Sequence, residues 1–229
     1  DGDYLHADGT TLGADNGIAV AYILALLSDE TIKHPRIEAV ITTDEEVGMH
    51  GAMALDLSNL KAKYMINLDS EEEGYLLASC AGGLTATCIL PVKRVAKKGR
   101  KISVNLGGLK GGHSGMDIVK NRTNANKLLA RLLFDLREKC SYSVLHMEGG
   151  FKDNVIPREA LAEIVIEPET DKYRQISNDI DAIMDIYKKE LRSSEPELNY
   201  AVNDLGEGEF DVLDPESFEK LLFLLVQIP

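Results

Sequence analysis

Three short acidic motifs in the first third of the chain could hold divalent metal ions. They occupy residues 13–17, 44–48 and 67–70. A hydrolase with two metal ions needs one carboxylate that bridges them at about 3.5–4 Å, and further ligands that leave a coordination position open. It also needs a free carboxylate to take a proton from the attacking water. The motifs supply four candidate carboxylates: Asp15, Glu45, Glu46 and Asp69.

Alternating helix and strand signals would place these carboxylates at one edge of a sheet. Residues 18–27 form an apolar run that predicts a buried helix, capped by Asp15 and Asn16. Residues 37–43 and 64–68 are predicted strands, and acidic residues follow each of them directly. This alternation favours an α/β fold with a mainly central sheet and flanking helices. Ligands bind such sheets beyond the carboxyl ends of the strands.

The charge of the chain is uneven. Residues 1–83 carry 15 Asp and Glu against 4 Lys and Arg, a net charge of -11, whereas residues 84–229 carry 23 against 21. An acidic section repels nucleic acid and anionic membrane surfaces, and close carboxylates favour bound cations. On charge alone a solvated acidic face is the more common explanation, and a single motif is more often a helix cap or surface loop. The three motifs together favour a metal site.

The bulk composition is that of an ordinary globular protein, with 44% hydrophobic and 28% charged residues. The longest apolar run, residues 18–27, is too short to cross a bilayer, and no signal peptide opens the sequence. The three cysteines, Cys80, Cys88 and Cys140, are odd in number and dispersed. They argue against a disulfide framework and favour a cytoplasmic location.

A shift in composition near Gly82 and Gly83 predicts a domain boundary, followed by an α+β domain. Elements after it do not alternate regularly. The predicted strands are residues 84–92, 102–106, 143–147 and 161–166, and the predicted helices are residues 124–138, 171–191 and 218–226. The first of these helices carries a leucine stripe typical of an amphipathic helix. Residues 193–196 are predicted to form a turn or short linker.

A glycine-rich loop at residues 107–115 could present a side chain to a cleft. It lacks the Gly-Lys-Ser/Thr ending of a P-loop and the spacing of a dinucleotide-binding fingerprint, so a phosphate site is rejected. Its glycines let the backbone turn tightly and would bring His113 into a cleft. A purely structural role for His113 stays open.

Six motifs, in order, resemble those of the aminoacyl-histidine (Xaa-His) dipeptidases, which belong to the zinc peptidase family of aminoacylase and carnosinase. The motifs occupy residues 9–17, 43–49, 67–74, 80–83, 108–115 and 154–160. The resemblance implies that Asp15 bridges two Zn²⁺ ions, with Co²⁺ or Mn²⁺ as alternatives. It further implies that Glu46 and Asp69 are terminal ligands and that Glu45 is the general base.

The resemblance also implies substrate contacts from a smaller lid domain. His113 would hydrogen-bond the substrate carboxylate or the developing oxyanion, and Asn154 would be a second polar contact. For Asn154, a simple role as a turn residue before residues 155–157 is equally open.

The sequence departs from the family pattern in two places. The family has a His-x-Asp motif well upstream of the bridging Asp and a further His far downstream. His6-Ala7-Asp8 has the pattern of the first motif but lies too close to Asp15. We expect that it is not the metal-binding His-x-Asp motif of the family. The chain looks truncated at both ends, and alone it is expected to bind metal weakly and to be inactive.

These observations predict part of a catalytic zinc-peptidase domain in residues 1–83 and a lid and dimerisation domain, truncated at its C-terminus, in residues 84–229. The expected activity is hydrolysis of Xaa-His dipeptides in the cytoplasm, with a peptide substrate, no nucleic-acid or membrane partner, and a homodimer as the family's common state. Two alternatives stay open. One is a related tripeptidase or N-deacylase, and the other is a non-catalytic module for binding or dimerisation.

Overall fold

The computed structural model describes residues 2–10, 12–70, 73–80 and 82–228. Four residues of the motifs, Thr11, Glu71, Glu72 and Ala81, lie outside the described residues. The chain divides into two compact units, Asp1–Gly83 and Leu84–Pro229. The division coincides with the composition shift in the sequence, and each unit is described by itself.

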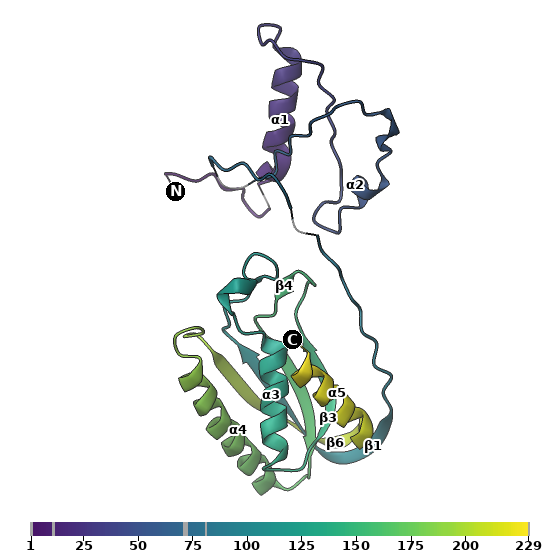
Figure 1. The fold of residues 1–229 in the computed structure, drawn as a ribbon. Coiled ribbons are helices and arrows are strands. Elements are labelled where there is room, and N and C mark those ends of the chain that lie inside the picture. Colours follow the sequence, from purple (N-terminus) through teal and green to yellow (C-terminus); the bar gives the residue numbers. More distant parts are fainter. Residues whose placement is uncertain (1, 11, 71–72, 81, 229) are drawn as a thin grey trace. The chain divides into compact units, whose positions relative to one another are not determined.

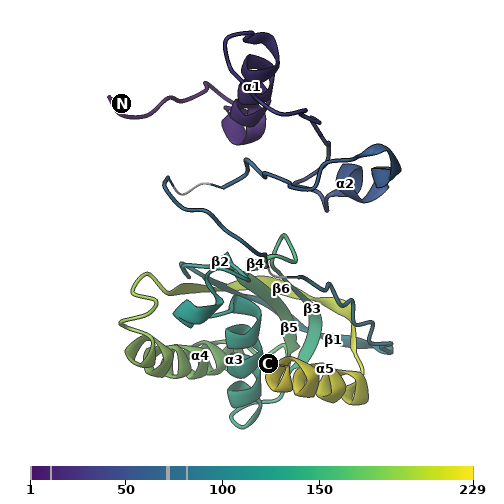
Figure 2. The ribbon, with the colours of Figure 1, turned by 45° about the horizontal axis from the view of Figure 1, so that its top comes forward.

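The second unit is built on a four-stranded antiparallel sheet with the order β3-β5-β1-β6. Its strands are β1 (Arg94–Gly107), β3 (Ser143–Gly149), β5 (Ala160–Ile166) and β6 (Asn199–Leu213). Three helices cover one face of this sheet, as Figures 1 and 2 both show. They are α3 (Ala125–Arg137), α4 (Thr170–Glu190) and α5 (Pro215–Gln227).

The core of this unit lies between the sheet and the helices. The predicted leucine stripe of α3 is buried there: Leu128, Leu129, Leu132, Leu133 and Leu136. Sheet residues Ile102, Val104 and Ile164 are fully buried against it. Because the burial of one large aliphatic side chain contributes about 1.5–3 kcal/mol, this core is the main source of stability in the unit.

Helix boundaries in the second unit follow signals in the sequence. Asn124 caps α3 by accepting hydrogen bonds from the backbone N–H groups of Asn126 (2.9 Å) and Lys127 (3.3 Å). Asp214 caps α5 in the same way through Ser217 N–H at 2.7 Å. Pro215 follows at the first helical position, where its missing N–H costs nothing. The three helices predicted in this unit are therefore confirmed.

A second, two-stranded sheet pairs β2 (Gly112–His113) with β4 (Val155–Ile156). A short 3-10 turn, η2 (Ile118–Lys120), follows β2. Two expectations for this unit were wrong. Residues 84–92 are not a strand, and the 15-residue β6, which follows the predicted turn at 193–196, was not foreseen. Its glycine and acidic residues hide the apolar alternation that indicates a strand.

The first unit holds the predicted helix as α1 (Ala14–Ser28), followed by α2 (His50–Ala54) and a 3-10 turn η1 (Leu57–Asn59). The strands predicted at 37–43 and 64–68 are absent, because neither segment has a ladder partner among the described residues. Inter-strand hydrogen bonds are what stabilise a strand. Ile66 is accordingly 82% exposed.

The mixed α/β fold class is confirmed by the second unit, where helices flank a central sheet. The central sheet predicted within residues 1–83 is not seen, because no strand forms among the described residues there. The second unit also has the α+β arrangement predicted for residues 84–229, and all strand pairs of its four-stranded sheet are antiparallel. Within the part of the chain that the structure describes, no helix combines the length and apolar character needed to cross a membrane.

Candidate functional site

Asn16 joins the first and third acidic motifs. Its side-chain amide donates to the carbonyl oxygen of Leu68 at 2.7 Å and to Oδ1 of Asp69 at 3.0 Å. Its Oδ1 accepts a hydrogen bond from Ala19 N–H at 3.1 Å, so Asn16 also caps the regular part of α1. The peptide bond between Asp15 and Asn16 is cis. Asn16 thus ties the Asp15 segment to the Asp69 segment, a role that the sequence did not indicate beyond capping.

The second acidic motif forms a tight turn. The carbonyl oxygen of Glu45 accepts from the N–H groups of Gly48 and Met49, both at 3.2 Å. Asp44 and Met49 adopt left-handed backbone angles on either side, with φ of 61° and 58°. The turn leaves the side chains of Glu45 and Glu46 exposed.

The donor chemistry of the acidic motifs suits zinc, since carboxylate oxygens are among its ordinary ligands. Their geometry does not complete a site. Asp15 and Asp69 are exposed like the two glutamates, and the described residues contain no group of three or more His, Cys, Asp or Glu side chains that could hold a metal ion. The metal-binding roles of Asp15, Glu46 and Asp69 and the basic role of Glu45 therefore stay predictions.

The structure brings the two predicted lid residues together. His113 pairs with Val155 in the small sheet, directly after Asn154. The backbone N–H of Ser114 donates to the carbonyl oxygen of Asn154 at 2.8 Å. Both His113 and Asn154 are exposed. The β2–β4 pairing therefore places two polar side chains, far apart in sequence, on neighbouring loops.

Asp117 braces the loop that carries His113. One of its carboxylate oxygens accepts from His113 N–H at 2.8 Å, and its own N–H donates to the His113 carbonyl at 2.9 Å. Lys120 lies 2.7 Å and Arg122 3.4 Å from the carboxylate. The Lys120 ammonium, the His113 N–H and Arg122 together hold the pKa of Asp117 below its usual value. Arg122 also donates to the carbonyl of Gly111.

Glu195 holds the start of the glycine loop from the opposite side. Its side chain is buried, and its two oxygens accept from Lys110 N–H at 2.8 Å and Thr123 N–H at 2.9 Å. A buried carboxylate needs such donors to offset its desolvation. Neither Glu195 nor Asp117 was predicted from the sequence, since neither residue belongs to a motif and their partners are backbone groups that no local pattern reveals.

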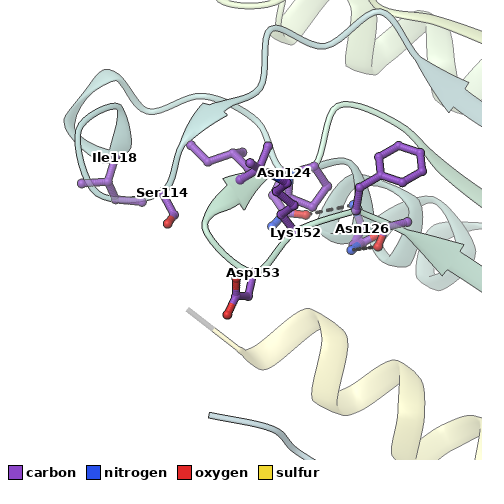
Figure 3. Close-up of a pocket in the computed structure, with 12 residues that line it drawn as sticks. Ser114, Ile118, Asn124, Asn126, Lys152 and Asp153 are labelled. Atoms are coloured by element: carbon purple, nitrogen blue, oxygen red, sulfur yellow. Dashed lines mark hydrogen bonds between the residues drawn. The ribbon is translucent and has the colours of Figure 1, made fainter. Parts of the chain in front are cut away.

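A pocket of about 530 Å³ lies beside these loops. Figure 3 shows Ser114 and Ile118 on one side, Asn124 and Asn126 at the start of α3, and Lys152 and Asp153 between them. Asn126 donates to the carbonyl of Gly149 at 3.2 Å, and Asp153 accepts from the Thr85 hydroxyl at 2.9 Å. A pocket with amide, hydroxyl and ammonium groups can hydrogen-bond the polar backbone of a peptide.

Comparison with known proteins points to one family. Residues 104–192 match a family model described as a peptidase dimerisation domain. The chain is 42% identical over 200 residues to the cytosol non-specific dipeptidase of Escherichia coli K12, covering 86% of this chain and 41% of that protein. It is 32% identical over 161 residues to the uncharacterised protein YqjE of Bacillus subtilis, covering 67% and 39%.

A solved structure agrees with these sequence comparisons. The aminoacylhistidine dipeptidase from Vibrio alginolyticus superposes with a TM-score of 0.64 at 31% identity, covering 100% of this chain and 46% of that one. The fold and the family model define a peptidase dimerisation domain within the second unit. The chain as a whole belongs to the peptidase family of the aminoacyl-histidine dipeptidases. It spans less than half the length of either dipeptidase.

Proposed function

We propose that the protein containing this chain hydrolyses dipeptides, in particular those with a C-terminal histidine. The observation that carries the proposal is the 42% identity to a dipeptidase over 86% of the chain. The Vibrio relative is an aminoacylhistidine dipeptidase, whereas the Escherichia coli relative is a non-specific dipeptidase. A preference for histidine is therefore the finer part of the proposal.

Asp15, Glu46 and Asp69 would hold two zinc ions, with Co²⁺ or Mn²⁺ as alternatives. Such ions polarise a peptide carbonyl and make water more acidic. Glu45 takes the proton of the attacking water and delivers it to the leaving amine. The support from this chain is the Asn16 bridge, which holds the Asp69 side chain beside the segment that begins α1.

The second unit would supply the substrate contacts. His113 donates a hydrogen bond to the substrate carboxylate or to the oxyanion that develops at the scissile carbonyl, and Asn154 adds a second polar contact. The adjacency of the two residues across β2 and β4 supports this role. We assign residues 1–83 to the catalytic domain and residues 84–229 to the lid and dimerisation domain, in a cytoplasmic homodimer.

The decisive test is Glu45→Gln in the full-length protein. The amide cannot accept the proton, so kcat should fall by about 10²–10⁴-fold, while the zinc content measured by elemental analysis stays unchanged. Glu30→Gln, which changes an exposed carboxylate of the same unit, is the control and should keep full activity. Undiminished turnover in the Glu45 variant would show that another group is the base.

A substrate panel tests the finer assignment. kcat/KM should be higher for dipeptides ending in histidine than for the same dipeptides ending in leucine or glycine. Equal values would support a broad dipeptidase, and faster cleavage of tripeptides or N-acyl amino acids would support the tripeptidase or deacylase alternative. A full-length protein without bound zinc and without hydrolytic activity would support a binding or dimerisation module.

A further inference from the structure

The ring of His113 is held by its own loop. Its Nδ1 lies 3.1 Å from the backbone nitrogen of Gly115 and 3.2 Å from that of Met116. Both backbone nitrogens carry a hydrogen that points to the ring, and a backbone N–H can only donate. Nδ1 must therefore accept both hydrogen bonds.

This geometry assigns the tautomer of the neutral ring. A neutral imidazole has one nitrogen that donates and one that accepts. With Nδ1 as the acceptor, the proton resides on Nε2, the nitrogen at the far end of the ring. Which ring nitrogen of His113 carries the proton is thus determined by two backbone N–H groups rather than by flexible side chains.

The turn around the ring is closed by Asp117. Its carboxylate accepts from His113 N–H and its N–H donates to the His113 carbonyl, so the two residues are joined at both backbone groups. Arg122 links the same carboxylate to the carbonyl of Gly111 on the other side of His113. Replacement of Gly112 would strain the backbone, because its φ is 140°, and a Cβ there would also lie 2.5 Å from an Asp117 carboxylate oxygen.

We infer that residues 113–117 lock His113 as the Nε2–H tautomer, and that Asp117 is the positioning residue that maintains this hydrogen-bond donor. The inference rests on the proposed function insofar as the donor serves a substrate oxygen. A donor fixed before the substrate binds needs no reorganisation as charge develops, which is how such groups contribute most to catalysis.

The tautomer can be measured without any activity. In ¹⁵N-labelled protein, long-range ¹H–¹⁵N spectra distinguish a protonated from an unprotonated ring nitrogen, and His113→Gln assigns the signals. At a pH where the ring is neutral, the wild-type 229-residue chain should show protonated Nε2 and unprotonated Nδ1. A mixture of tautomers, or protonated Nδ1, overturns the inference.

Asp117→Ala tests the positioning role. It should produce a mixture of tautomers, whereas Asp117→Asn, which retains an acceptor for His113 N–H, should keep the wild-type spectrum. Arg122→Met removes the support of the carboxylate and should shift the spectrum in the same direction as Asp117→Ala, which covers the case that the alanine variant does not fold. Glu159→Gln, which changes an exposed carboxylate between β4 and β5, is the control. A wild-type spectrum in both Asp117→Ala and Arg122→Met excludes the role.

Kinetics of the full-length protein complete the test. Asp117→Ala should lower kcat about 10-fold with little change in KM, less than the 10²–10³-fold loss expected when a donor to the oxyanion is removed outright. Asp117→Asn should recover most of the rate. If a variant with mixed tautomers keeps the wild-type kcat, the fixed Nε2–H tautomer does not contribute to catalysis. If the wild-type protein has no dipeptidase activity, the proposed function fails, and the spectra still decide the tautomer.

Discussion

The two units differ in what their apolar residues bury. Among the described residues, the buried hydrophobic side chains all belong to residues 84–229, except Ala19. Helix α1 in the first unit is richer in apolar residues than α3, yet Tyr22, Leu24 and Leu27 are more than half exposed. Helix α3 covers the sheet and buries its whole leucine stripe.

This difference separates helix formation from helix packing. Both helices were predicted from sequence, because local propensity and capping residues determine where a helix begins and ends. Most of the stability of a protein helix comes from packing its apolar face against a partner. The second unit contains that partner within 146 consecutive residues, and the described residues of the first unit do not.

The largest expected effect is on one matched pair of leucines. Leu133→Ala, at a fully buried position of α3, should lower the free energy of unfolding by about 2–5 kcal/mol. Leu24→Ala makes the same change on α1, where the side chain is 59% exposed, and should alter stability by less than about 0.5 kcal/mol. Urea denaturation of the 229-residue chain gives both values. Equal losses would mean that α1 is as well packed as α3.

A buried carboxylate of the second unit and an exposed one of the first unit should differ by a smaller amount. Glu195→Gln replaces one acceptor oxygen by an NH₂ group that faces a backbone N–H of Lys110 or Thr123. The lost hydrogen bond and the clash of two donors should cost about 1–3 kcal/mol. Glu30→Gln, at an exposed position of the first unit, should have no measurable effect. Amide chemical shifts of Lys110 and Thr123 should move only in the Glu195 variant, and a fully stable variant would show that the buried carboxylate is dispensable.

Sequence alone predicted the elements whose signals are local. The leucine stripe located α3. Helix α5 begins at Pro215, before the predicted start at residue 218, because Asp214 caps it there. The strands predicted at 37–43 and 64–68 depended on partners that periodicity cannot supply, and no ladder forms there in the described chain. β6 was missed because its burial depends on pairing with β1, which lies about 100 residues earlier in the sequence.

The candidate site also contains residues that were identified from the sequence and residues whose contacts appear only in the fold. The glycine-rich loop drew attention to His113, and the family resemblance implied Asn154 and the lid role of both residues. The pairing of β2 with β4 explains why they are neighbours. Asp117, Glu195 and the Asn16 bridge act through backbone contacts or through residues distant in sequence. Such contacts leave no spacing pattern, so they became visible only in the fold.

The smallest expected effect concerns two aspartates that both cap a helical turn. Hydrogen bonds from the Ser217 hydroxyl and N–H lower the pKa of Asp214 at α5, and those from the N–H and hydroxyl of Ser58 lower the pKa of Asp56 at η1. A carboxyl group with a lowered pKa stabilises the folded state above its unfolded pKa, about 3.9. That contribution is lost as the pH falls through the lower folded value.

The free energy of unfolding should depend on the ionisation of Asp214 and not on that of Asp56. Helix α5 buries Phe218 and Leu222 in the core, whereas η1 buries no residue. Asp214→Asn keeps an uncharged capping side chain, so its urea midpoint should decline less than that of the wild type between pH 6 and pH 3. Asp56→Asn should follow the wild-type curve. If Asp56→Asn flattened the pH dependence as much as Asp214→Asn, the turn at η1 would have to be coupled to cooperative unfolding. The two units could then no longer be treated as energetically distinct.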